Sequence, residues 1–395
     1  MGFLNGTMTF QRYRITKDPT GVFGDDHLKT MEKSRIGAFK TNLHEKPNVG
    51  FTAGDHLFDV DFDFAKNIIG EALHFGVRVD SCQIPGAIKR AWMQMELAPM
   101  MVENPGGRPS KAQREEAKAA VEQRCADEAD KGNFKRMAET PMLWDAETES
   151  MFVGSISEKV IDICLGHLEN AFAIEVAPVS SGKLAIQYAE ENGLVDFLEG
   201  VQATSFHPDG HNQVVWWNGM SENFDYLGNE FLLWLWWHWE MNTDIVELPD
   251  GSAVSGMFSK SLVLDCPRGE FGKETVSSDS PVALPETTLA VRMGKLPRKA
   301  GLTLVREGEQ YEFALQAESF AINGARISRV TKEDNSPRDD ETRIGSIRRM
   351  METLDMLYGV FCSKRLSKEW DAETKAILKW LRSETRLRVR KSSAA

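Results

Sequence analysis

The feature that most constrains the fold is an aromatic segment, NEFLLWLWWHWEM at residues 229–241, which places four tryptophans within six positions. Six of the ten tryptophans of the chain lie between Trp216 and Trp239. Such a run suits a membrane anchor, a platform for stacking nucleic-acid bases, an aromatic ligand cage or a buried core. Each of these four interpretations predicts a different environment for the segment in the folded protein.

Length excludes the membrane anchor, because the run covers only nine residues between Glu230 and Glu240, whereas a membrane helix needs about 20. If the segment is a helix, apolar side chains cover most of its circumference, which indicates burial on several sides. The neighbouring charged residues are acidic, and aromatics that stack on bases usually line a basic groove. We therefore expect a core or subunit-interface segment, with a surface for a protein partner as the alternative.

The composition is that of an ordinary globular protein of two or three folding units, with 395 residues, 42% hydrophobic and 27% charged. The first residues lack the basic and apolar regions of a secretory signal. Five cysteines are scattered without a CxxC pair. That usage predicts free thiols in a reducing cytoplasm and argues against a disulfide framework or a zinc site.

The charge is uneven along the chain. A net charge of −12 argues against a general polyanion binder. The last 20 residues nevertheless carry a net +5, so the preceding 375 residues sum to −17. The basic residues of this C-terminal stretch are Lys379, Arg382, Arg386, Arg388, Arg390 and Lys391. An acidic protein can still bind DNA if its basic residues converge on one surface.

Hydrophobic periodicity and turn residues predict an α+β chain of several subdomains. The expected regions are an N-terminal α+β region (1–105), a projecting polar helical segment (106–140), a hairpin with a helix and strand (141–200), a β-rich region containing the tryptophan segment (201–332) and a C-terminal helical region with a basic tail (333–395). In the last region an apolar stripe marks two helices; its residues are Ile347, Met350, Leu354, Leu357 and Phe361.

Two consecutive helices are expected on either side of the ENPGGRPS break. The first starts after Pro85 and should bury Ile88, Trp92 and Met95. The second follows Ser110, a good N-cap, and reads KAQREEAKAAVEQRCADEADK. So polar a helix cannot be deeply buried, and we expect it to project from the body.

These helices carry the candidate phosphate contacts. Lys111, Arg114 and Lys118 fall at i, i+3 and i+7 and share one helical face. The remaining candidates are Arg108 just before this helix and Lys89 and Arg90 on the preceding one. Neutralising phosphates needs only Lys or Arg side chains along a backbone, without base contacts. The alternative is a solvated helix surface.

A set of carboxylates is the main candidate for catalysis. DHLFDVDFDF at residues 55–64 alternates as a half-buried strand, with Asp59, Asp61 and Asp63 on one face. Carboxylates are Mg²⁺ ligands, and a nuclease would use them. Residues on one strand face are about 6.6 Å apart per step, so a metal site needs further ligands from elsewhere. A solvated strand face is the favoured interpretation.

Two shorter motifs carry less weight. His207 and His211 in HPDGH sit around a turn, without the helix that an HExxH metal site requires. SSGK at residues 180–183 lacks the upstream glycine of a phosphate-binding loop and is expected to be a turn.

Several segments together resemble the RdgC family of recombination-associated proteins in order and spacing. They are FGVRVDSCQIPGAIKR, GRPSKAQREEAKAAVEQR, MLWDAETESMFVGS and FAIEVAPVSSGKLA, followed by GNEFLLWLWW and LDMLYGVFCSKRLSKEW. The resemblance covers most of the chain. In the stretch FKRMAETPMLWD, where the family pattern is more densely basic, this sequence has only Lys135 and Arg136, and both are counted among the DNA-binding candidates.

The resemblance implies a ring-shaped homodimer that binds duplex DNA without sequence preference and restrains a RecA-type recombinase. It places the DNA-binding channel on Arg108, Lys111, Arg114 and Lys118 and implies a cytoplasmic, nucleoid-associated protein. We therefore expect a non-enzymatic DNA-binding protein without cofactor or metal. The alternatives are a metal-dependent exonuclease using Asp59, Asp61 and Asp63, and a protein-interaction module that does not bind DNA.

Overall fold

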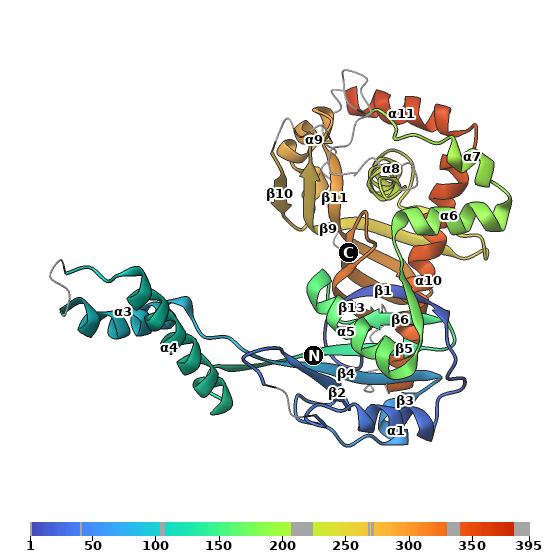
Figure 1. Cartoon of the computed structure of the whole chain (residues 1–395). Helices are drawn as coiled ribbons and strands as arrows, with labels where there is room; N and C mark the ends of the chain where they lie inside the picture. Colours follow the sequence, from blue (N-terminus) through green and yellow to red (C-terminus); the bar gives the residue numbers. More distant parts are fainter. Residues whose placement is uncertain are drawn as a thin grey trace. The chain divides into compact units, whose positions relative to one another are not determined.

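The structure is a computed structural model that describes residues 2–39, 42–102, 107–206, 224–267, 269, 272–329 and 340–382 (Figure 1). The chain divides into two compact units. Unit 1 contains residues 1–16, 145–156 and 176–395, and unit 2 contains residues 17–144 and 157–175. The described residues form eleven α-helices and thirteen strands, which confirms a mixed α and β fold. The five sequence regions and the ring-shaped dimer stay predictions.

Unit 2 is built on strands β2 to β5, with helices α1 to α5. Their bounds are α1 Asp25–Lys33, β2 Asn48–Thr52, α2 Phe64–Asn67, β3 Ile68–Ile69, β4 Ala72–Cys82, α3 Gly86–Val102, α4 Lys111–Asp130, β5 Lys135–Asp145 and α5 Glu158–Phe172. Strand β4 pairs antiparallel with β2 and β3 and lies next to β5. Helices α1 and α5 contact β2 and enclose an aromatic core in which His27 stacks on Phe172, with ring centroids 5.8 Å apart.

Unit 1 contains an antiparallel sheet in the order β10-β9-β11-β12-β13-β1-β6. The strand bounds are β1 Met8–Lys17, β6 Ser150–Val153, β7 Glu175–Pro178, β8 Ile245–Glu247, β9 Ala253–Asp265, β10 Glu274–Ser277, β11 Leu296–Arg306, β12 Glu309–Gln316 and β13 Ile322–Arg329. Strands β11 and β12 join at Glu307 and Gly308, which both have positive φ, 49° and 79°. That is the backbone of a type I′ hairpin turn, which favours glycine at its second position.

The helices of unit 1 surround this sheet and the tryptophan segment. They are α6 Ser181–Asn192, α7 Val195–Glu199, α8 Leu227–Met241, the 3₁₀ helix η1 Pro281–Ala283, α9 Pro285–Arg292, α10 Asp340–Arg365 and α11 Trp370–Arg382. The predicted apolar stripe of α10 is buried throughout, and the two expected C-terminal helices are confirmed.

The tryptophan segment is helix α8, and Figure 1 looks down its axis within unit 1. All its residues from Leu227 to Trp237 are buried, whereas Trp239 is half-buried, so the expectation of a core segment is confirmed for Trp234, Trp236 and Trp237. Phe231 packs edge-on against Tyr358, and Trp236 against Trp380. Phe231, Trp236 and Tyr358 are buried in this packing, and Trp380 is half-buried. Trp216 and Trp217 lie outside the described residues.

Several local expectations are confirmed and two are wrong. The strands on either side of the turn at 146–149 form, and α5 begins after Ser157. Helix α3 buries Trp92, but Met95 is exposed, because α4 covers one side of α3 and nothing described covers the side bearing Met95. The SSGK stretch is not a turn: Ser180 caps α6 by accepting a hydrogen bond from Lys183 N at 3.3 Å.

Two further findings concern the described residues as a whole. None of their helices is long and apolar enough to cross a membrane. All five cysteines are free thiols, as expected from their spacing.

Candidate nucleic-acid interface

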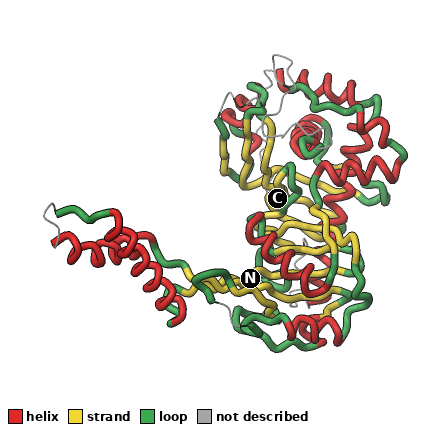
Figure 2. The backbone as a smooth tube through the Cα atoms, viewed as in Figure 1, coloured by secondary structure: helices red, strands yellow, loops and turns green. Residues whose placement is uncertain are grey.

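The candidate basic residues lie on a helical arm, which we define as residues 83–134 of unit 2. The arm leaves the sheet at the end of β4 and returns at the start of β5, and Gln83 N donates to Phe134 O at 3.1 Å across its base. Figures 1 and 2 show its two helices, α3 and α4, extending beyond the strands of unit 2. The expectation of a helix that projects is thus fulfilled within this unit.

A small apolar core holds the two helices together. Trp92 of α3 packs with Val121 and Cys125 of α4, and Phe134 adds a ring contact to Trp92 at 6.4 Å. The Arg124 guanidinium lies over the Trp92 ring, 4.7 Å from its centroid. Since α4 otherwise buries only alanines, α3 approaches closely and the remaining circumference of α4 faces solvent.

The start of α4 is set by a reciprocal cap. Ser110 Oγ accepts from Gln113 N at 3.2 Å, while Gln113 Oε1 accepts from Ser110 N at 2.9 Å. Such a capping box satisfies two backbone donors at the helix end that would otherwise lack partners. Gln113 Nε2 also reaches Met100 O at 3.5 Å, which links the start of α4 to the end of α3. Lys111 is therefore the first residue of a defined helix.

Lys111, Arg114 and Lys118 are exposed on this helix, and helical geometry spreads them over about 10.5 Å. Within the described part of the chain, none of the three makes an ion pair. On α3, Arg90 is exposed and Lys89 is half-buried. These five basic side chains thus lie on two adjacent helices of the arm, four of them exposed.

The other three candidates differ among themselves. Lys135 Nζ is 2.9 Å from Asp80, a carboxylate that also binds Arg78. Arg136 Nη1 donates to Gln83 Oε1 at 2.5 Å. Arg108 is exposed in the stretch before the cap. We therefore assign Lys135 to the structure of β4 and β5, and Arg136 to the base of the arm.

The arm carries no net charge in an acidic chain. Residues 83–134 contain eight Lys and Arg against eight Asp and Glu, whereas the whole chain has a net charge of −12. Several acids of α4 have local partners: Glu122 lies 3.6 Å from His44, and Glu128 binds Lys131 and Asn133. The hydrogen bond from Asn133, with help from Lys131, lowers the pKa of Glu128.

The strand predicted at 55–64 does not form, and its carboxylates do not share a face. Asp59 is buried and Phe58 is exposed, the reverse of the expected pattern. The reason is local: Asp59 accepts from Asp61 N at 3.2 Å, and Asp63 caps the short helix α2 by accepting from Ala65 N at 2.9 Å. Short acidic side chains that bond nearby backbone favour turns over strands.

Asp59 already has a cation partner. Lys66 Nζ donates to both of its carboxylate oxygens, at 3.0 and 2.8 Å. Burial would raise the pKa of Asp59, but the hydrogen bonds from Lys66 and from Asp61 N outweigh burial and lower that pKa. Asp61 and Asp63 are exposed. The single strand face on which the exonuclease hypothesis rested is therefore absent.

No three His, Cys, Asp or Glu side chains gather as a metal-ion site among the residues that the structure describes. His207 and His211 fall outside those residues.

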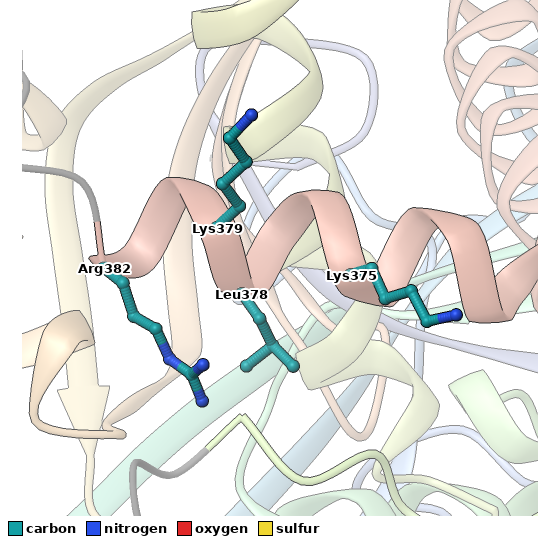
Figure 3. Close-up of a pocket in the computed structure, with 4 residues that line it drawn as sticks. All are labelled: Lys375, Leu378, Lys379 and Arg382. Carbon is teal, nitrogen blue, oxygen red and sulfur yellow. The ribbon is translucent and has the colours of Figure 1, made fainter.

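A second basic stripe lies on α11 of unit 1. Lys375, Leu378, Lys379 and Arg382 line a cavity of about 520 Å³, and Figure 3 shows these four side chains on the helix. The sequence reasoning included Lys379 and Arg382 in the basic C-terminal stretch but missed Lys375. Its spacing could have identified it, because residues 375, 379 and 382 fall at i, i+4 and i+7 and therefore share one helical face. The remaining basic residues of that stretch, Arg386, Arg388, Arg390 and Lys391, lie outside the described residues.

No protein-family model matches this sequence, and no curated protein matches it.

Proposed function

We propose that this chain is a non-enzymatic protein that binds duplex DNA without sequence preference through the arm of unit 2. The observation that carries the proposal is the unpaired, exposed cationic face of α4, Lys111, Arg114 and Lys118. Several other cations of unit 2 have acidic partners, as Lys66 has Asp59 and Arg78 has Asp80. A charge held toward solvent on a rigid, capped helix suits an external anion.

The chemistry is phosphate neutralisation. A stripe of about 10.5 Å spans roughly three phosphates of one strand, which follow each other at about 3.4 Å along the axis. Each phosphate neutralised releases counterions and adds about 0.9 to the slope of log affinity against log salt. Because Lys and Arg contacts to phosphates read no base edges, the binding is independent of sequence.

We propose further that the protein acts as a homodimer that encircles DNA and restrains a RecA-type recombinase by occluding the duplex. Helix α3 supports a second-copy contact. Three of its apolar side chains, Met95, Met101 and Val102, are 59%, 39% and 87% exposed, while Trp92 is the one that is buried. Exposed apolar side chains gathered on one element are typical of a surface that another protein covers.

Fluorescence anisotropy with a labelled duplex tests the DNA proposal. We expect the wild-type protein to bind at low salt, and the triple variant K111E/R114E/K118E to lose binding. The matched control reverses three exposed lysines of unit 2 outside the arm, K29E/K33E/K46E, and changes the net charge by the same amount. No binding by the wild-type protein, or equal loss in both triple variants, would contradict the proposal.

The same preparation tests the exonuclease alternative. End-labelled duplex incubated with Mg²⁺ or Mn²⁺ should keep its length. Shortening that disappears in Asp61→Ala would replace the present proposal with a nuclease.

A further inference from the structure

Several cations of unit 1 are neutralised by neighbouring acids. Arg365 is 2.6 Å from Glu230, Lys295 is 2.5 Å from Glu274, and Arg349 is 3.0 Å from Glu309. Helix α11 is different: Lys375, Lys379 and Arg382 are all exposed, and none of them makes an ion pair within the described part of the chain. Three exposed cations thus lie on one helix of a chain with a net charge of −12.

The opposite side of α11 holds the helix in place. Trp370, Ile377 and Leu381 are buried, and the Trp380 ring meets Trp236 of α8 at 5.6 Å. With its apolar side occupied by the protein core, α11 cannot insert that side into a lipid surface. What it offers outward is the cationic stripe, and Figure 3 shows Lys375, Lys379 and Arg382 projecting from the helix around Leu378.

The helix dipole and a neighbouring acid explain only part of the positive charge on α11. Basic residues in the last turn of a helix interact favourably with its dipole, by about 0.3–1 kcal/mol. Lys379 and Arg382 are in that last turn, but Lys375 is not. Asp371 precedes Lys375 by four residues, and such a pair offsets only part of the stripe's charge.

The stripe matches the cationic face of the arm. Both place three cations within eight residues on one helical face, at positions 111, 114 and 118 and at positions 375, 379 and 382. Both stripes therefore extend about 10.5 Å, the length of roughly three phosphates of one strand. The sequence that follows α11 continues basic, with Arg386, Arg388 and Arg390.

We infer that the α11 stripe is a second phosphate-backbone contact for duplex DNA, carried by unit 1 and separate from the arm. This inference rests on the proposed function. Lys375, Lys379 and Arg382 neutralise phosphates, and Leu378 packs against the sugar edge of the backbone without reading bases.

The salt dependence of duplex binding tests it. Removing three phosphate contacts should lower the slope of log affinity against log salt by about 2 to 3, so we expect K375E/K379E/R382E to show this drop. K375Q/K379Q/R382Q should show a similar drop, and it guards against misfolding caused by charge reversal. The control is K183E/K273E/K368E, three scattered exposed lysines of unit 1, which should keep the wild-type slope.

The outcomes separate this inference from the proposal on which it rests. If the arm variant loses binding while both α11 variants keep the wild-type slope, the α11 contact is wrong and DNA binding through the arm stands. If the wild-type protein binds no duplex, both are wrong. If K183E/K273E/K368E lowered the salt slope as much as the α11 variants, the drop would come from the change in net charge. That result would also overturn the α11 contact. Every variant should keep the wild-type tryptophan fluorescence, which shows that unit 1 is still folded.

Discussion

Arg365 of α10 donates from Nε to Glu230 Oε2 of α8 at 2.6 Å, and both side chains are buried. The same carboxylate accepts from Thr204 N at 2.6 Å, and Arg365 Nη2 donates to Gln202 O at 2.6 Å. This network explains why an acid interrupts the apolar run at its N-terminal end. Glu230 lies inside the core with a cation partner, whereas Glu240 at the other end is exposed.

Glu230→Gln should destabilise unit 1 by about 3–5 kcal/mol, because it leaves the Arg365 charge buried without a counter-ion. Urea unfolding followed by tryptophan fluorescence measures the change. Adding Arg365→Met to Glu230→Gln should recover part of the loss, since a buried pair can be exchanged for apolar groups at little cost. The control Glu240→Gln should change the free energy of unfolding by less than about 1 kcal/mol. Equal effects at positions 230 and 240 would contradict this account.

Gly228 at the start of α8 lies against the backbone of the turn after β12. A Cβ added there would be 1.8 Å from Ala317 O, so the helix would have to move. Glycine to alanine normally stabilises a helix interior by about 1 kcal/mol. Gly228→Ala should instead destabilise unit 1 by about 1–3 kcal/mol, as overpacking does.

Gly359→Ala in α10 is the matched control for this change. Its Cβ would make an ordinary contact with the Tyr188 ring at 3.8 Å, and the substitution should raise the free energy of unfolding. Thermal unfolding of both variants compares the two sites. A stabilising Gly228→Ala would show that α8 does not lie so close to Ala317.

Elements held by nearby residues could be predicted from the sequence. Ser110 and the polar helix after it, the apolar stripe of α10 from Ile347 to Phe361, and the helix after Ser157 depend on caps and on a period of 3.6. The structure has all three. The basic residues of α4 could be placed on one face for the same reason.

Contacts that hydrophobic periodicity does not encode could not be predicted. Asp59 was assigned to a strand face because alternation was the only available signal, whereas Lys66 and local backbone donors decide its position. Nor does periodicity reveal that β1 pairs with β13, with Met8 opposite Ala325. The composition of unit 1 from three separate stretches depends on such pairings. Lys135 was assigned to DNA because sequence alone does not show that Asp80 lies beside it.

Acid should destabilise unit 2 through His74. Both ring nitrogens of this buried residue lack a hydrogen-bond partner among the described residues, and burial lowers the pKa of His74 to about 4. The ring stays neutral in the folded protein, while in the unfolded chain it takes up a proton near pH 6.5. The contribution of the neutral ring is therefore complete above pH 6.5 and is lost as the pH falls from about 6.5 to about 4.

His74→Leu removes this titration. Unit 2 of the variant should therefore lose less stability than the wild type as the pH falls from about 6.5 to about 4. The difference in unfolding free energy between variant and wild type should grow by about 3 kcal/mol from pH 7 to pH 4. Urea unfolding at several pH values measures it, because the carboxylates common to both proteins cancel in the difference. The control is the same substitution at His56, which lies on the surface. A difference independent of pH would mean that the His74 ring is accessible to protons.

The apolar side of α3 should determine the oligomeric state. Met95→Gln together with Val102→Gln replaces two of its most exposed apolar side chains and leaves the charge of the arm unchanged. Each apolar anchor at the centre of an interface contributes more than about 1 kcal/mol, so the dimer should weaken by about tenfold or more. Sedimentation equilibrium over a range of concentrations measures the dissociation constant. The control, Met257→Gln with Leu289→Gln, changes exposed apolar residues of unit 1 and should leave the dimer intact. The α3 contact would be contradicted if the wild-type protein were a monomer at all concentrations. It would also be contradicted if the α3 variant formed the dimer with the wild-type dissociation constant.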